Sequence, residues 1–205
     1  MATAQNVIDS VRVATDQDGA TAITDTQLLN WFNEEYRTLQ SRLFDVAPDY
    51  FENSRTFTLT SSNTWTIDVF IAKIRKIMRL EGSVYVPLPM ASMLRAEPGE
   101  ELAWRVRAAA FIDIHPATSA AGSYKMVYIP QATSLAAGGT IDLPDGADTY
   151  LVHKLSARVR ARFEETDLVR THSEWAKEAY EALVKLMARP VIGTPQTVVD
   201  VYGDY

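Results

Sequence analysis

The clearest pattern of apolar and polar positions lies between residues 144 and 190. Apolar side chains recur there every three or four positions, in two sets: Leu151, Leu155, Val159 and Phe163, then Trp175, Ala179, Leu183 and Leu186. Each set falls on one face of an α-helix. The spacing predicts helices over about 147–165 and 172–189, joined into a hairpin by a polar turn at 166–173. Because an apolar face has to be covered, this hairpin needs a partner surface from elsewhere in the chain.

Two more helices are predicted near the N-terminus, over about 4–14 and about 25–46. The longer one carries an apolar stripe with the same spacing: Leu28, Phe32, Tyr36, Leu39 and Leu43. Thr24 or Asp25 has the side-chain oxygen that caps a helix start, and Pro48 cannot continue the helix. The stripe makes this helix the expected partner of the C-terminal hairpin.

The period of the pattern changes between residues 54 and 130. Residues 55–60 alternate polar and apolar side chains, as a half-buried strand does. Further strand candidates, separated by polar or glycine-containing turns, are found at 65–67, 74–80, 84–87, 104–106, 110–114 and 125–129. Residues 90–94 fit either a short helix or an irregular turn. The order of elements predicts an α+β fold, in which the N- and C-terminal helices form a mainly helical bundle with an inserted β-rich lobe over about 54–130.

The last residues of the chain follow neither period. Beyond Pro190 the sequence nevertheless keeps large apolar side chains: Ile192, Val198, Val199, Val201, Tyr202 and Tyr205. A disordered tail usually carries fewer of them, and an extended apolar tail can add to a neighbour's sheet or lie in its groove. We therefore predict a single domain over residues 1–190 and an extended, partner-binding tail over residues 191–205.

Composition and charge narrow the class of protein. A chain of 205 residues with 47% hydrophobic residues is typical of one domain, with or without an inserted lobe. The net charge of −6 argues against tight sequence-specific DNA binding, because basic groups that neutralise phosphate supply much of that affinity. The absence of cysteine excludes disulfides, cysteine-ligated metals and a thiol nucleophile. We expect no membrane span and no signal peptide, and a protein made in a reducing cytoplasm.

Histidine and serine offer no catalytic pattern. His115, His153 and His172 lack the spacing of metal ligands and are expected to be separate surface or capping residues. No Gly-x-Ser-x-Gly sequence is present.

The acidic residues that precede the first C-terminal helix partly resemble a calcium-binding loop. Asp142, Asp145 and Asp148 stand three positions apart, however, and the closing glutamate of such a loop is missing. We expect Asp145 or Asp148 to cap the following helix instead.

The sequence also contains two clusters of basic residues. One lies in the strand region (Lys73, Arg75, Lys76 and Arg79) and the other in one helix (Arg158, Arg160 and Arg162). We expect ordinary ion pairs with nearby carboxylates. The sharper alternatives are salt bridges between subunits or transient contact with phosphate. The residues thus predict no enzyme, no cofactor and no metal site.

Three segments carry a family resemblance. Residues 25–39 (DTQLLNWFNEEYRTL) begin a helix with an acid and two leucines, and residues 124–131 (YKMVYIPQ) form an aromatic strand that ends in proline. Residues 141–152 (IDLPDGADTYLV) lead through Leu-Pro-Asp into a helix. Together they resemble the head–tail connector (adaptor) proteins of tailed bacteriophages, in order over roughly residues 4–189. Phe32 stands where that family usually has Ile.

The resemblance implies a ring, usually of twelve subunits, docked beneath the portal protein at the capsid vertex. Such a ring extends the DNA channel and gives a tail-side connector or tail protein a landing surface. The chain would be a structural protein of the virion that double-stranded DNA passes without sequence-specific binding, which an acidic balance suits. Ring contacts are heterologous, so two different surfaces of each subunit must match. The tail over residues 191–205 is then expected to bind the portal or a neighbouring subunit.

Two other functions stay open at this point. A small ligand- or protein-binding module could use aromatic side chains of the lobe: Trp65, Tyr85 and Trp104. A hydrolase could use scattered carboxylates such as Glu34, Glu35 and Asp113, although only the general abundance of acids supports it.

Overall fold

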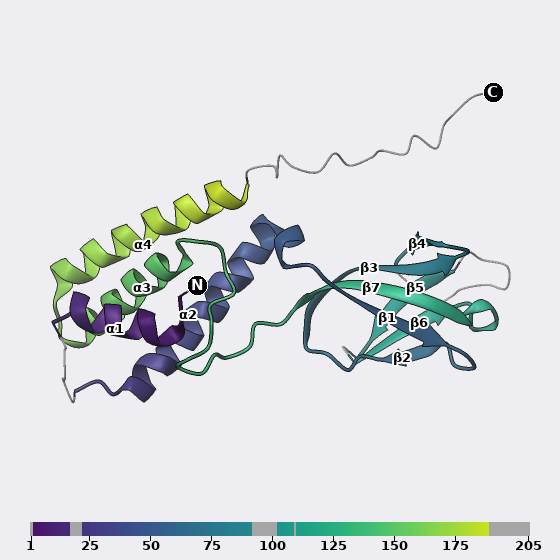
Figure 1. Cartoon of the computed structure of the whole chain (residues 1–205), viewed down its shortest axis with the longest axis horizontal. Helices are drawn as coiled ribbons and strands as arrows, with labels where there is room; N and C mark the ends of the chain where they lie inside the picture. Colours follow the sequence, from purple (N-terminus) through teal and green to yellow (C-terminus); the bar gives the residue numbers. More distant parts are fainter. Residues whose placement is uncertain (1, 17–21, 92–101, 109, 189–205) are drawn as a thin grey trace, which may run out of the picture.

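A computed structural model describes residues 2–16, 22–91, 102–108 and 110–188, with the helices gathered at one end and the strands at the other (Figure 1). Within these residues the fold is α+β, as predicted, with four α-helices and two antiparallel sheets. The helices are α1 (Ala4–Ala14), α2 (Asp25–Val46), α3 (Ala147–Arg162) and α4 (Thr166–Met187), with the short 3₁₀ helices η1 (Pro48–Phe51) and η2 (Ala117–Ser119). The strands are β1 (Asn53–Leu59), β2 (Thr64–Thr66), β3 (Ile71–Glu81), β4 (Val84–Leu88), β5 (Ala103–Arg107), β6 (Phe111–His115) and β7 (Gly122–Pro130).

The two N-terminal helices begin at reciprocal caps. Thr24 Oγ1 accepts from the backbone N–H of Gln27 at 3.2 Å, and Gln27 Oε1 accepts from the backbone N–H of Thr24 at 3.0 Å. Thr3 and Asn6 make the same arrangement at the start of α1. Each cap satisfies backbone donors that a helix start leaves unpaired. The predicted bounds of both helices and the Thr24 cap are confirmed.

The link between α3 and α4 is shorter than predicted. α4 begins at Thr166, so the polar turn expected at 166–173 is wrong, and only residues 163–165 join the two helices. Glu164 turns the chain there with a φ of 61°. Residues 166–173 contain no glycine or proline, and their polar side chains are typical of both a loop and the solvent-facing side of a helix.

The start of α3 also differs from the prediction. Its N-cap is Gly146 with a φ of 91°, so neither Asp145 nor Asp148 is the N-cap residue, although Asp148 Oδ1 accepts from the backbone N–H of Thr149 at 2.9 Å within the first turn. Asp148 lies in the first turn, where its charge complements the helix dipole. A left-handed φ favours glycine, and Leu183 Cδ2 of α4 would stand 3.7 Å from a Cβ at this position.

α4 buries a narrower face than its apolar stripe indicates. Three residues of the predicted stripes lie partly at the surface: Phe163 (38% exposed), Trp175 (46%) and Leu186 (46%). The buried residues of α4 are His172, Ala176 and Leu183. Because α4 packs chiefly on α3, only the side chains that face α3 are covered, and one edge of the stripe stays exposed.

The helices enclose one core and the strands another. In the first, which we call the helical part, α3 packs against α1, α2 and α4, and Leu151 and Leu155 are fully buried. Phe51 of η1 and Ile129 at the end of β7 also belong to this core, which joins it to the strands. In the second, the strand part, the core takes side chains from both sheets, among them Ile77 and Ile112.

The two sheets of the strand part have the orders β1-β7-β3-β4 and β2-β6-β5. Gly82 turns the β3–β4 hairpin with a φ of 62°, at the turn that the sequence predicts. Met90 pairs with Trp104 in a parallel bridge, which links the end of β4 to β5. The strand candidates of the sequence are confirmed with small changes of their bounds. Of the ambiguous residues 90–94, those from 92 onward lie outside the described residues.

Candidate interaction site

The predicted partner-binding residues lie outside the described residues. The described chain ends at Ala188, and the residues of the prediction all follow it: Ile192, Val198, Val199, Val201, Tyr202 and Tyr205. Their role as partner-binding residues stays a prediction.

Ala188, the last described residue, lines a groove. It has a volume of about 770 Å³ and is lined by residues 46–50, 141–145 and 186–188. We call it the terminal groove. Its walls are the end of α2 with η1, the segment before α3, and the last turn of α4. Most of its lining is apolar, and Tyr50 is 56% exposed at its rim.

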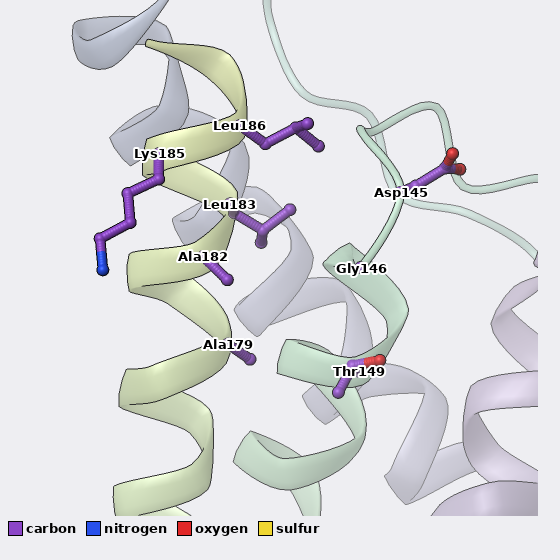
Figure 2. A pocket seen from close by; sticks show the side chains of 8 residues that line it. All are labelled: Asp145, Gly146, Thr149, Ala179, Ala182, Leu183, Lys185 and Leu186. Atoms are coloured by element: carbon purple, nitrogen blue, oxygen red, sulfur yellow. The ribbon is translucent and has the colours of Figure 1, made fainter. Parts of the chain in front are cut away.

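A second hollow of about 510 Å³ continues the groove between α3 and α4. Figure 2 shows Leu183 and Leu186 extending from α4 toward the side of Gly146, whereas Lys185 points away from the gap. Asp145 and Leu186 line both hollows, so the two form one continuous surface at this end of the helices.

The terminal groove is acidic. Asp49, Asp142 and Asp145 line it. Burial raises the pKa of Tyr50, and the charges of Asp142 and Asp145 raise it further. Arg75 approaches Asp49 at 3.5 Å but lies closer to Glu52, at 3.1 Å. The groove therefore offers an apolar floor with an excess of negative charge, which is suited to a segment that carries a cation beside apolar side chains.

The structure brings two histidines together, contrary to the prediction that the histidines are separate. His153 Nδ1 of α3 and His172 Nδ1 of α4 lie 3.4 Å apart. The centroid of the Trp175 ring lies 5.3 Å from the centroid of each imidazole ring. Burial lowers the pKa of both, and the charges of His153 and Arg160 lower that of His172 further. Their separation of 19 residues matches no metal motif, so only the packing of α3 on α4 reveals the pair.

The proposed hydrolase carboxylates are not brought together. Glu34 accepts from Arg158 Nη1 at 2.6 Å on the helical part, and Glu35 lies near Tyr150. Asp113 lies in β6 of the strand part.

Asp113 forms a clamp across its sheet. Its Oδ2 accepts from Arg105 Nε at 3.2 Å and from Arg107 Nε at 3.0 Å, and its Oδ1 accepts from Thr64 Oγ1 at 2.8 Å. Burial alone would raise the pKa of this carboxyl, but the hydrogen bonds of the two arginines and Thr64 outweigh burial and lower it. A carboxylate held in this way joins β2, β6 and β5 and is not free to act as a general base.

The aromatic side chains Trp65, Tyr85 and Trp104 of the strand part make separate contacts. Trp65 stacks on Phe57 at a centroid distance of 4.4 Å, and Trp104 is 3% exposed, with its Nε1 donating to Leu88 O at 3.1 Å. Tyr85 makes a different contact: Lys125 Nζ lies 5.8 Å from the centroid of its ring. Both tryptophans thus serve the core of the strand part.

The arginines of α3 make the expected ion pairs. Arg158 pairs with Glu34 and lies over the ring of Trp31 at 4.7 Å. Arg160 pairs with Glu165 at 2.7 Å and also donates to Ala14 O, which ties α3 to the end of α1. The prediction of ordinary ion pairs is confirmed for these two residues.

Comparison of the chain with protein-family models and with curated proteins gives no match. Among the described residues, no cluster of three or more histidines and carboxylates could hold a metal ion. No helix within those residues is long and apolar enough to cross a membrane.

Proposed function

We propose that this chain is a structural protein of a tailed-bacteriophage virion: a head–tail connector that forms a ring between portal and tail. In this proposal the helical part is a bundle that makes the ring body, and the strand part is a lobe inserted into it. The tail over residues 191–205 reaches the portal or a neighbouring subunit. The ring extends the DNA channel, offers the tail-side protein its attachment surface, and has neither enzymatic activity nor a cofactor.

The observation that carries the proposal is exposed apolar surface in two separate places. On α4, Leu168 (41% exposed), Trp175 and Leu186 follow one another at spacings of 7 and 11 residues, which puts them on one face of the helix. On the β3–β4 hairpin, Val84 is 62% and Val86 39% exposed. We call these surfaces the α4 stripe and the hairpin tip. Contiguous exposed apolar patches mark interaction sites, and we propose that each of these two sets forms one.

Two unlike surfaces are what a ring requires. A ring closes through heterologous contacts, in which one patch of a subunit meets a different patch of the next. The α4 stripe belongs to the helical part and the hairpin tip to the strand part, at opposite ends of the chain's long axis (Figure 1). A dimer with two-fold symmetry would need only one self-complementary surface.

The test uses two variants that each block one surface, Trp175→Asp and Val84→Asp. We expect the unmodified chain, mixed with portal protein, to give ring-shaped particles in electron micrographs, and each variant alone to stay monomeric by light scattering. A mixture of the two variants should give a one-to-one dimer, because each partner keeps the surface that the other lacks. Lys177→Ala, at the exposed side of α4, is the matched control and should assemble normally.

Two results would contradict the proposal. One is a monomer that never associates with itself or with portal. The other is assembly that neither charged substitution weakens. The first result would favour the alternative of a small ligand- or protein-binding module without catalysis, and the volume of the terminal groove lies within the range of small-ligand sites.

A further inference from the structure

The terminal groove collects the negative ends of two helices. α2 ends at Val46 and α4 at Met187, and both ends line the groove. The final carbonyl groups of a helix lack partners within it and act as roughly half a negative charge. No basic residue lies in the last turn of α2. In the last turn of α4, Lys185 points away from the neighbouring hollow (Figure 2).

The acidic side chains that line the terminal groove add to the negative charge of the two helix ends. Asp142 and Asp145 line the groove, and neither has an ion pair within the described residues. The pKa of Tyr50 is raised first by burial and then by these two carboxylates, which places their charge at the rim. A cation entering the groove would therefore meet two carboxylates and two helix ends together.

The apolar floor limits what can accompany that cation. Leu186 is 46% exposed, and the segments 46–48 and 141–144 supply further apolar atoms. A lone metal ion would leave this surface uncovered. A short chain segment with one basic residue next to branched apolar residues fits both features of the groove.

The chain itself carries such a segment at this place. Ala188 lines the groove, and the residues that follow it are Arg189, Pro190, Val191 and Ile192. Pro190 cannot continue α4 and disfavours a helical residue before it. Four extended residues reach about 14 Å, and tethering gives them a millimolar effective concentration at the groove.

We propose that residues 189–192 dock in the terminal groove of their own chain, with the guanidinium of Arg189 against Asp142 and Asp145 and with Val191 and Ile192 on the apolar floor. This assigns Ile192 to an intrachain anchor. The later apolar residues of the tail, from Val198 to Tyr205, are then the ones presented to a partner, and the anchor sets the point from which they leave. The inference does not depend on ring formation.

Cross-linking tests the docking directly, because the chain has no cysteine of its own. We would introduce Tyr50→Cys with Ile192→Cys, and as a matched control Lys177→Cys with Ile192→Cys, and react each dilute protein with a short bismaleimide. A docked segment gives an intramolecular, monomer-sized product on the order of tenfold faster for the first pair than for the control pair. Equal rates for the two pairs would overturn the proposal, and so would products of dimer size only, which would place the segment in another copy.

A second measurement leaves the groove residues unchanged and needs no cysteine. Arg189→Gln should speed hydrogen exchange of residues 46–50 and 141–145 several-fold, because losing a charge-assisted hydrogen bond reduces the docked-to-free ratio on the order of tenfold. Arg189→Lys should restore most of the protection. Exchange that Arg189→Gln does not alter would contradict the docking even if the cysteine variants fail to fold.

Discussion

The strand part and the helical part differ in how completely they satisfy their buried polar groups. In the strand part, the Asp113 carboxylate is paired with two arginines and Thr64, and the hydroxyl of Tyr124 donates to Ala120 O at 2.6 Å. Among the described residues, the buried side-chain atoms without a hydrogen-bond partner are one in the strand part, His115 Nε2, and four in the helical part: Gln40 Oε1, Tyr150 Oη, Ser156 Oγ and Arg160 Nε. The helical part therefore leaves more of its buried polar atoms without a protein partner than the strand part does, and the terminal groove also lies in it.

The largest expected effects test whether the two cores are independent. Leu155→Ala in the helical core should lower the free energy of unfolding by about 3 kcal/mol, and Ile112→Val in the strand core by about 1 kcal/mol. Both side chains are fully buried, in separate clusters. The double variant, measured by urea unfolding, should equal the sum within about 0.5 kcal/mol. A larger coupling would contradict the separation of the cores.

The Asp113 clamp gives the next effect. Asp113→Asn should cost about 2 kcal/mol, because the carboxylate is 3% exposed and accepts from two arginines. Arg107 is 52% exposed, so water takes over part of its hydrogen bonding and the loss stays below that of a fully buried pair. Urea unfolding measures the cost, and hydrogen exchange should locate it in β2, β5 and β6. A change confined to the helices would show that the clamp does not stabilise its own sheet.

Two buried tyrosines, one in each part, differ in whether the hydroxyl group has a hydrogen-bond partner among the described residues. Tyr124→Phe should destabilise the protein by about 1 kcal/mol, because it removes the hydrogen bond to Ala120 O. Tyr150→Phe should change stability by less than about 0.5 kcal/mol or increase it, because the hydroxyl of Tyr150 is buried without a partner among the described residues. Thermal unfolding of both variants decides the point. Equal losses would remove the contrast between the two parts.

The histidine pair predicts a pH dependence that belongs to the helical part. The folded-state pKa values of His153 and His172 lie below the ordinary value, so the unfolded chain takes up protons first as the pH falls. Stability should be complete above about pH 6.5 and should decrease as the pH drops below it.

The control for this dependence is the double variant His153→Gln with His172→Gln. Its loss of stability between pH 7 and pH 5 should be smaller than that of the unmodified chain, because the carboxylates and Arg160 are common to both proteins. Identical pH profiles in chemical unfolding would show that the contact between the two rings has no energetic role.

Much of the fold follows from local patterns in the sequence. The helix over Asp25–Val46 has a capping residue, an apolar stripe and a following proline, and all three give the same answer. The β3–β4 hairpin has glycine at the turn. The predicted start of α4 is wrong for two reasons. Residues 166–173 contain no glycine or proline that would mark a boundary, and a polar turn has the same composition as the polar face of a helix.

The candidate site is harder to predict because it depends on packing between distant segments. The terminal groove combines residues 46–50, 141–145 and 186–188, which have no common motif. The contact of His153 with His172 needs the register of α3 on α4. The sequence does identify the apolar residues that follow Ala188, but the acidic lining appears only when Asp49 of η1 is brought beside Asp142 and Asp145 of the segment before α3.

We propose above all that the chain forms a ring on the portal through two unlike surfaces. The most direct measurement is electron microscopy of the purified chain mixed with the proposed portal partner, followed by the same mixture with Trp175→Asp. We predict a ring seated on one face of the portal with the unmodified chain and bare portal particles with the variant. Bare portals with the unmodified chain, at concentrations at which it is folded, would contradict the account.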